Sequence, residues 1–216
     1  DHRADGGQGA QQPFGIPRLA TDPEMLGTEH EAIEPFAFGR KTAPAVAIAA
    51  MHLLADGRDE VLLVLPADHV IEDESSFHQA LGVARMAAEQ GEMVLFGIPA
   101  EQAETGYGYI KIGAPVDGAP GTRAVERFVE KPDLATAERF VAEGGYVWNS
   151  GMFVFRCSRY LEELKQHDPD IYDTCVLALQ RSKTDLEYVR IDASTFACCP
   201  DNSIDYAVME KASRAC

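Results

Sequence analysis

The sequence predicts an α/β fold, with a mostly parallel, doubly wound sheet, helices on both of its faces and an added β layer. Two observations lead to this prediction. Helix-like and strand-like segments alternate between residues 42 and 98 with no sign of paired hairpins. The strand-like segments are short apolar runs such as VLLVL at 61–65, which is typical of strands that are buried on both faces of a parallel sheet.

Composition limits the number of domains and the kinds of partner. The chain has 216 residues, of which 46% are hydrophobic, and this is enough for one well-buried domain. A net charge of -16 argues against binding to nucleic acid or to an anionic membrane surface, because both would be repelled. The five cysteines show no zinc-binding spacing and are expected to be reduced thiols of a cytoplasmic protein.

The first segment differs in character from the rest. Residues 1–32 are rich in Gly, Gln and Pro and lack apolar periodicity, so they are expected to be irregular or disordered, and residues 33–216 to form the folded domain. The alternation of helices and strands then begins. Thr42 can cap a helix and Gly57 can end it, and the Ala-rich face between them can pack closely on a sheet.

The later elements follow from caps, apolar stripes and glycine or proline breaks. A strand at 61–65 and another at 93–98 flank a helix at 74–90, which carries an apolar stripe and ends before Gly91. Strands at 106–112 and 124–130 are expected to form the added β layer. Beyond them we expect a strand at 146–156 and helices at 133–143, 158–167, 169–181 and 203–214.

Asp68 is the first candidate for chemistry. It follows the strand at 61–65, at the carboxyl end where open α/β sheets bind ligands. A carboxylate there suits Mg²⁺, which proteins hold with one or two carboxylates and with the phosphates of the substrate. The same residue could simply cap the helix that follows, and the local sequence does not separate the two interpretations.

Two further candidates lie where strands begin or end. Gly106 and Gly108 would let a ligand approach the backbone amides, or they mark a simple β-bulge. Glu130 could accept hydrogen bonds from two sugar hydroxyls while Lys131 faces a phosphate, provided that the strand ends there and both side chains share one side. A solvated acid–base pair at a strand end is the alternative.

The third candidate interrupts a strand. Asn149, Ser150 and Gly151 lie inside the aromatic run YVWNSGMF. A buried side-chain amide without partners costs roughly 1–3 kcal/mol, so Asn149 requires partners, which a sugar or the backbone can supply.

Six segments, in order and at these separations, carry a dense resemblance to a known family: EPFAFGRKTAPAVAIAA, LLVLPADHVI, ETGYGYIKI, FVEKPD, YVWNSGMF and CPDNSIDYAVMEK. From about Glu34 to Cys216 the chain resembles the bacterial mannose-1-phosphate guanylyltransferases that are fused to a phosphomannose isomerase and serve alginate and other polysaccharides. The resemblance implies a Rossmann-like sugar-nucleotidyltransferase fold. It also implies the reaction of GTP with mannose 1-phosphate to give GDP-mannose and pyrophosphate, with Mg²⁺ as cofactor.

The resemblance assigns roles by position. Asp68 would be a catalytic metal ligand, and Lys131 would hold the sugar phosphate as a second catalytic residue. It also implies that the segment from Arg40 to Thr42 lies near the nucleotide. Four further residues would line the sugar: Gly108, Glu130, Asn149 and Gly151. Asp205 matches a family position to which no role is assigned, and in a first helical turn it could serve only the helix dipole.

The chain also departs from the family pattern. The glycine-rich phosphate loop is not visible in residues 1–32, Lys41 stands where the family has Asn, and a second metal-binding Asp and the isomerase are not present by Cys216. The domain is therefore expected to be incomplete at both ends, with its activity as this chain left open. Two alternatives remain: a sugar nucleotidyltransferase that uses another base or sugar, or a non-catalytic sugar-phosphate binding module. Self-association into a homo-oligomer is also left open.

Overall fold

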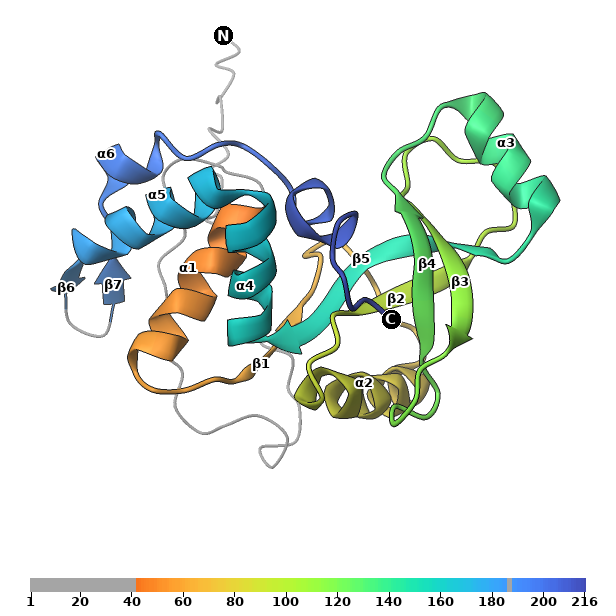
Figure 1. Ribbon diagram of the computed structural model, residues 1–216, viewed down its shortest axis with the longest axis horizontal. Coiled ribbons are helices and arrows are strands. Elements are labelled where there is room, and N and C mark those ends of the chain that lie inside the picture. The colour runs from red at the N-terminus through yellow and green to blue at the C-terminus, as the bar shows by residue number, and fades with distance from the viewer. Residues whose placement is uncertain (1–41, 186–187) are drawn as a thin grey trace, which may run out of the picture.

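The computed structural model describes residues 42–185 and 188–216, which form a five-stranded sheet with helices packed on both faces and a separate two-stranded sheet (Figure 1). The elements in chain order are α1 (Thr42–Ala55), β1 (Val61–Val64), α2 (Glu74–Glu89), β2 (Val94–Pro99), β3 (Tyr109–Pro115), β4 (Arg123–Val129), α3 (Leu134–Glu143), β5 (Tyr146–Arg156), α4 (Cys157–His167), α5 (Pro169–Gln180), β6 (Lys183–Asp185), β7 (Tyr188–Arg190), α6 (Ala193–Phe196) and the π-helical turn η1 (Asp205–Met209).

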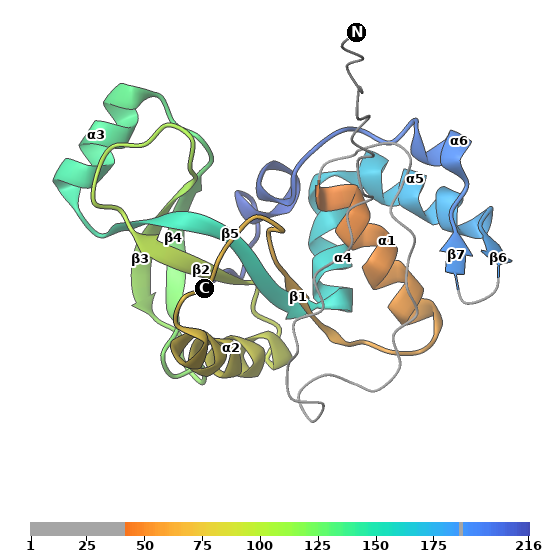
Figure 2. The same cartoon turned by 180° about the vertical axis from the view of Figure 1, so that it is seen from behind.

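β5 organises the sheet. It pairs with β1, β2 and β3, and β3 pairs in turn with β4, all in antiparallel fashion. Both β1 and β2 pair with residues Phe153 and Val154, so β5 lies between them. Both views show it running from the α3 end of the molecule to α4 (Figures 1 and 2).

The α/β class is confirmed, but the prediction of a mostly parallel sheet is wrong for the strands that the structure describes. β1 and β2 do run in the same direction with α2 between them in the chain, as the alternation predicts. The later strand β5 inserts between them in the opposite direction. Local sequence patterns do not indicate which distant strand will insert at a given place.

Side chains of β5 alternate between two apolar clusters. Phe153 and Phe155 pack in the cluster that contains α1, α4 and α5, whereas Val154 packs in the cluster that contains α2. A third cluster joins α3 to β3 and β5, where the rings of Phe140 and Tyr146 stack with their centroids 4.2 Å apart. The expected two-sided helical cover is therefore present, and the α3 cluster sits at the far end of the sheet.

The region after α5 differs most from the prediction. The hairpin of β6 and β7 was not predicted, and the helix expected at 203–214 shortens to η1. Residues 214–216 instead form backbone hydrogen bonds beside β2 and β4: Met93 donates its N–H to the carbonyl of Arg214 (2.8 Å), and Val125 donates to that of Ala215 (2.9 Å). These contacts hold the backbone away from helical geometry. In the described part of the chain, no helix has the length and apolarity that a bilayer crossing requires.

Candidate functional site

A cavity of about 360 Å³ opens beside the middle of β5. It is bounded by the loop after β1, the end of β2, the loop before β3, the end of β4 and the start of η1. Its lining residues are His69, Ile98, Gly106, Tyr107, Gly108, Glu130, Lys131, Trp148, Asn149, Ser150, Gly151 and Asp205. All the residues expected at the sugar and its phosphate, which are Gly108, Glu130, Lys131, Asn149 and Gly151, are among them. Their binding roles stay predictions.

The end of β4 brings Glu130 and Lys131 to the same side. β4 ends at Val129, and Lys131 has a φ of +46°, a left-handed conformation that costs roughly 1 kcal/mol for a side chain of this kind. Because the backbone turns there, Nζ of Lys131 lies 2.8 Å from Oε1 of Glu130. This is the condition that sequence reasoning set for the two residues to act together.

Glu130 is buried with one carboxylate oxygen unused. Its side chain is 5% exposed, and Oε2 has no hydrogen-bond partner among the described residues. Burial raises its pKa, the hydrogen bond from Lys131 opposes this, and the neighbouring carboxylates of Asp205 and Glu210 raise it again. The buried indole Nε1 of Trp148 likewise has no partner in the described region. Two residues that line the cavity therefore each carry a buried polar atom, one acceptor and one donor, that no described protein group satisfies.

Gly108 makes room for this carboxylate. A Cβ at this position would collide with Oε2 of Glu130 and would lie 3.3 Å from Cβ of Asn149. The carbonyl of Gly108 also accepts a hydrogen bond from the backbone N–H of Asn149 (2.7 Å). The role of this glycine is thus close packing against the acidic side chain, as well as backbone pairing with β5.

Asn149 finds partners inside the protein. Its Nδ2 donates to Oδ1 of Asp205 (2.7 Å), and its Oδ1 accepts from the backbone N–H of Gly151 (3.1 Å), which has a φ of +73°. One amide hydrogen and one lone pair of Asn149 remain for a ligand.

Asp68 lies in an exposed turn after β1, next to His69, which lines the cavity. It does not cap the following helix: that role belongs to Asp73, whose carboxylate accepts from the backbone N–H of Ser76 (2.9 Å). Within residues 42–185 and 188–216, no three His, Cys, Asp or Glu side chains are grouped to hold a metal. An exposed carboxylate beside the cavity still fits Mg²⁺ held mainly by ligand phosphates, which requires only one or two protein carboxylates.

Of the segment expected near the nucleotide, only Thr42 lies among the described residues. Thr42 begins α1, and its hydroxyl accepts a hydrogen bond from the backbone N–H of Ile204 (3.0 Å), immediately before Asp205. Arg40 lies outside the described residues. Whether either residue contacts a nucleotide stays a prediction.

Sequence reasoning did not select the aromatic residues of the cavity. The rings of Tyr107 and Trp148 lie 5.3 Å apart at an interplanar angle of 57°, and both line the cavity. Strict alternation along a strand would place Trp148 and Asn149 on opposite faces. Both nevertheless line the cavity, although they pair in regular register with Ile98 and Gly97 of β2; the register shift lies just beyond them, between Asn149 and Phe153. The only signal in the sequence was the position of these aromatic residues beside Gly106, Gly108 and Asn149.

A second hollow, of about 480 Å³, lies between α5 and α6. Two of its polar side chains already have protein partners: Arg181 donates to the hydroxyl of Thr195 (3.0 Å), and that hydroxyl donates to Asp192 (2.6 Å). It lacks the buried, unsatisfied atoms of the first cavity, so the cavity beside β5 is the stronger candidate site.

Known proteins resemble this chain over most of its length. The family model for nucleotidyl transferases matches residues 11–194. The chain is 67% identical over 193 residues to the alginate biosynthesis protein AlgA of Pseudomonas aeruginosa, covering 89% of this chain and 40% of that protein. It is 48% identical over 192 residues to a mannose-1-phosphate guanylyltransferase of Escherichia coli K12, covering 87% and 40%.

A solved structure described as a mannose-6-phosphate isomerase from Helicobacter pylori matches with a TM-score of 0.74 and 32% identity, covering 83% of this chain and 68% of that one. The chain thus spans about 40% of the length of the curated relatives quoted above.

Proposed function

Because the chain belongs to the nucleotidyl transferase family, we propose that it is the sugar-phosphate-binding part of a mannose-1-phosphate guanylyltransferase. In that reaction a phosphate oxygen of mannose 1-phosphate bonds to the α-phosphorus of GTP, the bond from that phosphorus to the bridging oxygen breaks, and pyrophosphate leaves. The relatives that carry this name, or the name of an alginate biosynthesis protein, support the choice of substrate class.

The observation that carries the proposal is the buried Glu130 with its unsatisfied Oε2, held beside Lys131 in the cavity. An ionised carboxylate accepts hydrogen bonds from sugar hydroxyls, and a neighbouring ammonium group attracts the phosphate of the same molecule. The aromatic faces of Tyr107 and Trp148 complete a wall suited to the C–H faces of a pyranose ring.

The residues of this chain would act by positioning. Glu130 and Asn149 would orient the sugar, and Lys131 would hold the attacking phosphate. Asp68 would contribute a carboxylate to Mg²⁺, which would screen the charge of the triphosphate when bound. No nucleophilic side chain is required, since nucleotidyl transfer depends on alignment and on cations aimed at the transferring phosphorus.

We also infer a cytoplasmic setting. The five cysteines, all within the described part of the chain, are thiols rather than disulfides, which is typical of reducing compartments. Enzymes that use phosphorylated sugars and nucleoside triphosphates act in such compartments.

A sugar-phosphate binding module without turnover is the second candidate, and one observation favours it. Among the described residues that line the cavity, Lys131 is the one lysine or arginine, whereas Glu130 and Asp205 are acidic. One ammonium group can match a sugar monophosphate, but a triphosphate requires further cations from elsewhere in the protein.

Pyrophosphate release tests the proposal. The full chain is supplied with Mg²⁺, mannose 1-phosphate and each nucleoside triphosphate in turn, with Lys131→Ala as the comparison variant and a parallel series in which a chelator removes the metal. We expect release that favours GTP and that disappears in Lys131→Ala and on chelation. Release that favours another nucleotide would reassign the base. Saturable binding of mannose 1-phosphate with no release at any Mg²⁺ concentration would establish the binding module instead.

A further inference from the structure

Asp205 opens η1 and reaches the cavity from an element that follows β5 by about 50 residues. Its Oδ1 accepts the hydrogen bond from Nδ2 of Asn149 at 2.7 Å. A residue that merely stabilised the first turn of a helix through its dipole would not need this partner. The contact therefore gives Asp205 a specific role toward the cavity.

The orientation of the Asn149 carboxamide is fixed from two sides. An ionised carboxylate can only accept hydrogen bonds, so the nitrogen of the amide must face Asp205. On the other side a backbone N–H, that of Gly151, can only donate, so the oxygen must face it. Turning the amide over would place two oxygens together and two N–H groups together. The remaining donor and acceptor of Asn149 consequently have defined places in the cavity.

η1 is anchored before and within its turn. Immediately before it, the N–H of Ile204 donates to the hydroxyl of Thr42 in α1 (3.0 Å). Within it, Ala207, Val208 and Met209 are buried. Directly after it, the carboxylate of Glu210 accepts from the backbone N–H of Glu130 at 2.7 Å, which ties the same segment to the end of β4.

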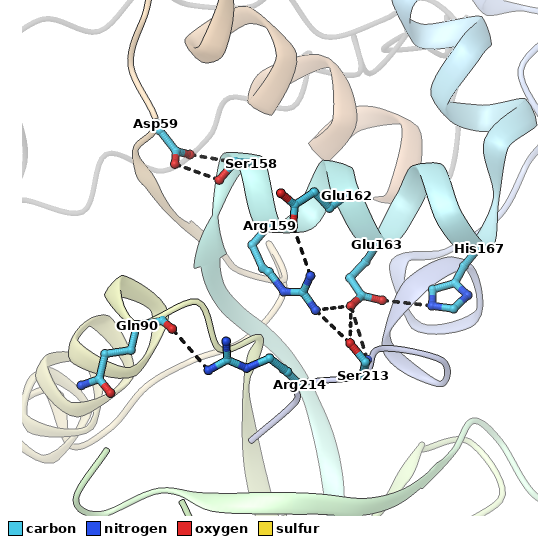
Figure 3. Close-up of polar contacts among 9 residues, drawn as sticks. All are labelled: Asp59, Gln90, Ser158, Arg159, Glu162, Glu163, His167, Ser213 and Arg214. Atoms are coloured by element: carbon cyan, nitrogen blue, oxygen red, sulfur yellow. Dashed lines mark hydrogen bonds and ion pairs between the residues drawn. The ribbon is translucent and has the colours of Figure 1, made fainter. Parts of the chain in front are cut away.

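A buried polar cluster holds the chain just beyond (Figure 3). Oε1 of Glu163 in α4 accepts from the hydroxyl of Ser213 (2.9 Å) and also from Arg159, and Oε2 lies 3.0 Å from Nε2 of His167. Glu163 is 2% exposed, so the acceptor side of this attachment is buried, although Ser213 itself is exposed. Asp205 thus belongs to a segment whose backbone is held at both ends beside the cavity.

We propose that Asp205 is a positioning residue, which fixes the carboxamide of Asn149 so that the cavity distinguishes sugar phosphates by the arrangement of their hydroxyl groups. The inference rests on the proposed function for its ligand class. It adds that selectivity among hexose phosphates depends on a residue that acts through Asn149. Because a donor and an acceptor in fixed places cannot exchange, an epimer with one hydroxyl reversed loses a hydrogen bond.

The test compares Asp205→Ala and Asp205→Asn with wild type in the full chain, with Asp117→Ala as a matched control. Asp117 is an exposed acidic residue in the turn between β3 and β4. Asp205→Asn keeps the shape and an acceptor oxygen, so it separates hydrogen bonding from charge. Thermal unfolding of each variant shows that the fold persists.

The first readout needs no ligand. In ¹H–¹⁵N spectra the side-chain amide of Asn149, identified by its disappearance in Asn149→Ser, should show one strongly shifted proton in wild type. That shift should vanish in Asp205→Ala and persist in Asp205→Asn and Asp117→Ala. An unchanged Asn149 amide in Asp205→Ala would overturn the positioning role, whatever the ligand proves to be.

The second readout is the dissociation constant of glucose 1-phosphate divided by that of mannose 1-phosphate, two sugar phosphates that differ at one hydroxyl. We expect Asp205→Ala to reduce this ratio by about tenfold, the effect of one hydrogen bond to a polar partner, and Asp205→Asn to restore most of it. A ratio unchanged in Asp205→Ala, or equally low in Asp205→Asn, would overturn the proposal. If wild type binds neither sugar phosphate, the proposed function and the sugar-selecting role fall together, while the amide spectrum still tests the geometry.

Discussion

Gly108→Ala tests most directly whether the Glu130 carboxylate binds the ligand. The added methyl would collide with Oε2 of Glu130 and would lie 3.2 Å from Cζ of Phe128. Phe128 is buried and cannot retreat, so the carboxylate has to swing away. Overpacking of this kind costs about 1–3 kcal/mol of stability. Loss of one hydrogen bond from a sugar hydroxyl to a charged oxygen costs about 1.5–3 kcal/mol, which is roughly a 10- to 150-fold weaker dissociation constant.

Isothermal titration of mannose 1-phosphate into the full chain measures this effect, and thermal unfolding reports the packing cost separately. Gly106→Ala is the matched control, because Gly106 also lines the cavity but a Cβ there would meet no atom within 4 Å. We expect the control to bind within about twofold of wild type. Unchanged affinity in Gly108→Ala, or an equal loss in Gly106→Ala, would refute the role given to Glu130.

Three other features yield further predictions. Since burial raises the pKa of Glu130 above its ordinary value of 4.5, the folded chain holds this proton more tightly than the unfolded chain. Its contribution to stability should therefore fall as the pH rises from 4.5 through the raised pKa, and Glu130→Gln should remove that fall in denaturant titrations between about pH 4 and about pH 7. Glu163→Ala leaves Arg159 without its buried partner and should lower the free energy of unfolding by about 3 kcal/mol in urea titrations. Glu162→Ala, which removes a side chain that is 68% exposed, should change it by less than about 0.5 kcal/mol, and similar losses in the two variants would contradict this account. Cys198 is the one exposed cysteine of the five. A colorimetric thiol titration should therefore count one fast-reacting thiol in the folded chain, none in folded Cys198→Ser, and five in the unfolded wild-type chain. A second fast-reacting thiol in the folded chain would show that a buried cysteine is accessible.

Elements set by neighbouring residues were predictable from the sequence, and contacts between distant segments were not. The strand β5 has the expected bounds and the helix α2 ends one residue earlier than expected, because caps, apolar stripes and proline or glycine breaks act locally. The sequence set only a condition for Glu130 and Lys131 to act together, that the strand ends there, and β4 does end at Val129. The direction of β5 in the sheet and the contact of Asp205 with Asn149 depend on long-range packing, which no local pattern encodes.

The same long-range pairing affects how the chain can be made in a cell. Every strand that borders β5 is synthesised before it, and none can complete its ladder until its partners in β5 have left the ribosome: up to residue 148 for β3, 154 for β2 and 156 for β1. β3 and β4 can meanwhile pair with each other as a hairpin, whereas β1 and β2 lack β5, their partner in the finished sheet, and expose unpaired backbone edges. Such edges favour association between nascent chains. The yield of folded protein should therefore depend on translation speed and on chaperone supply, even when the finished fold is stable.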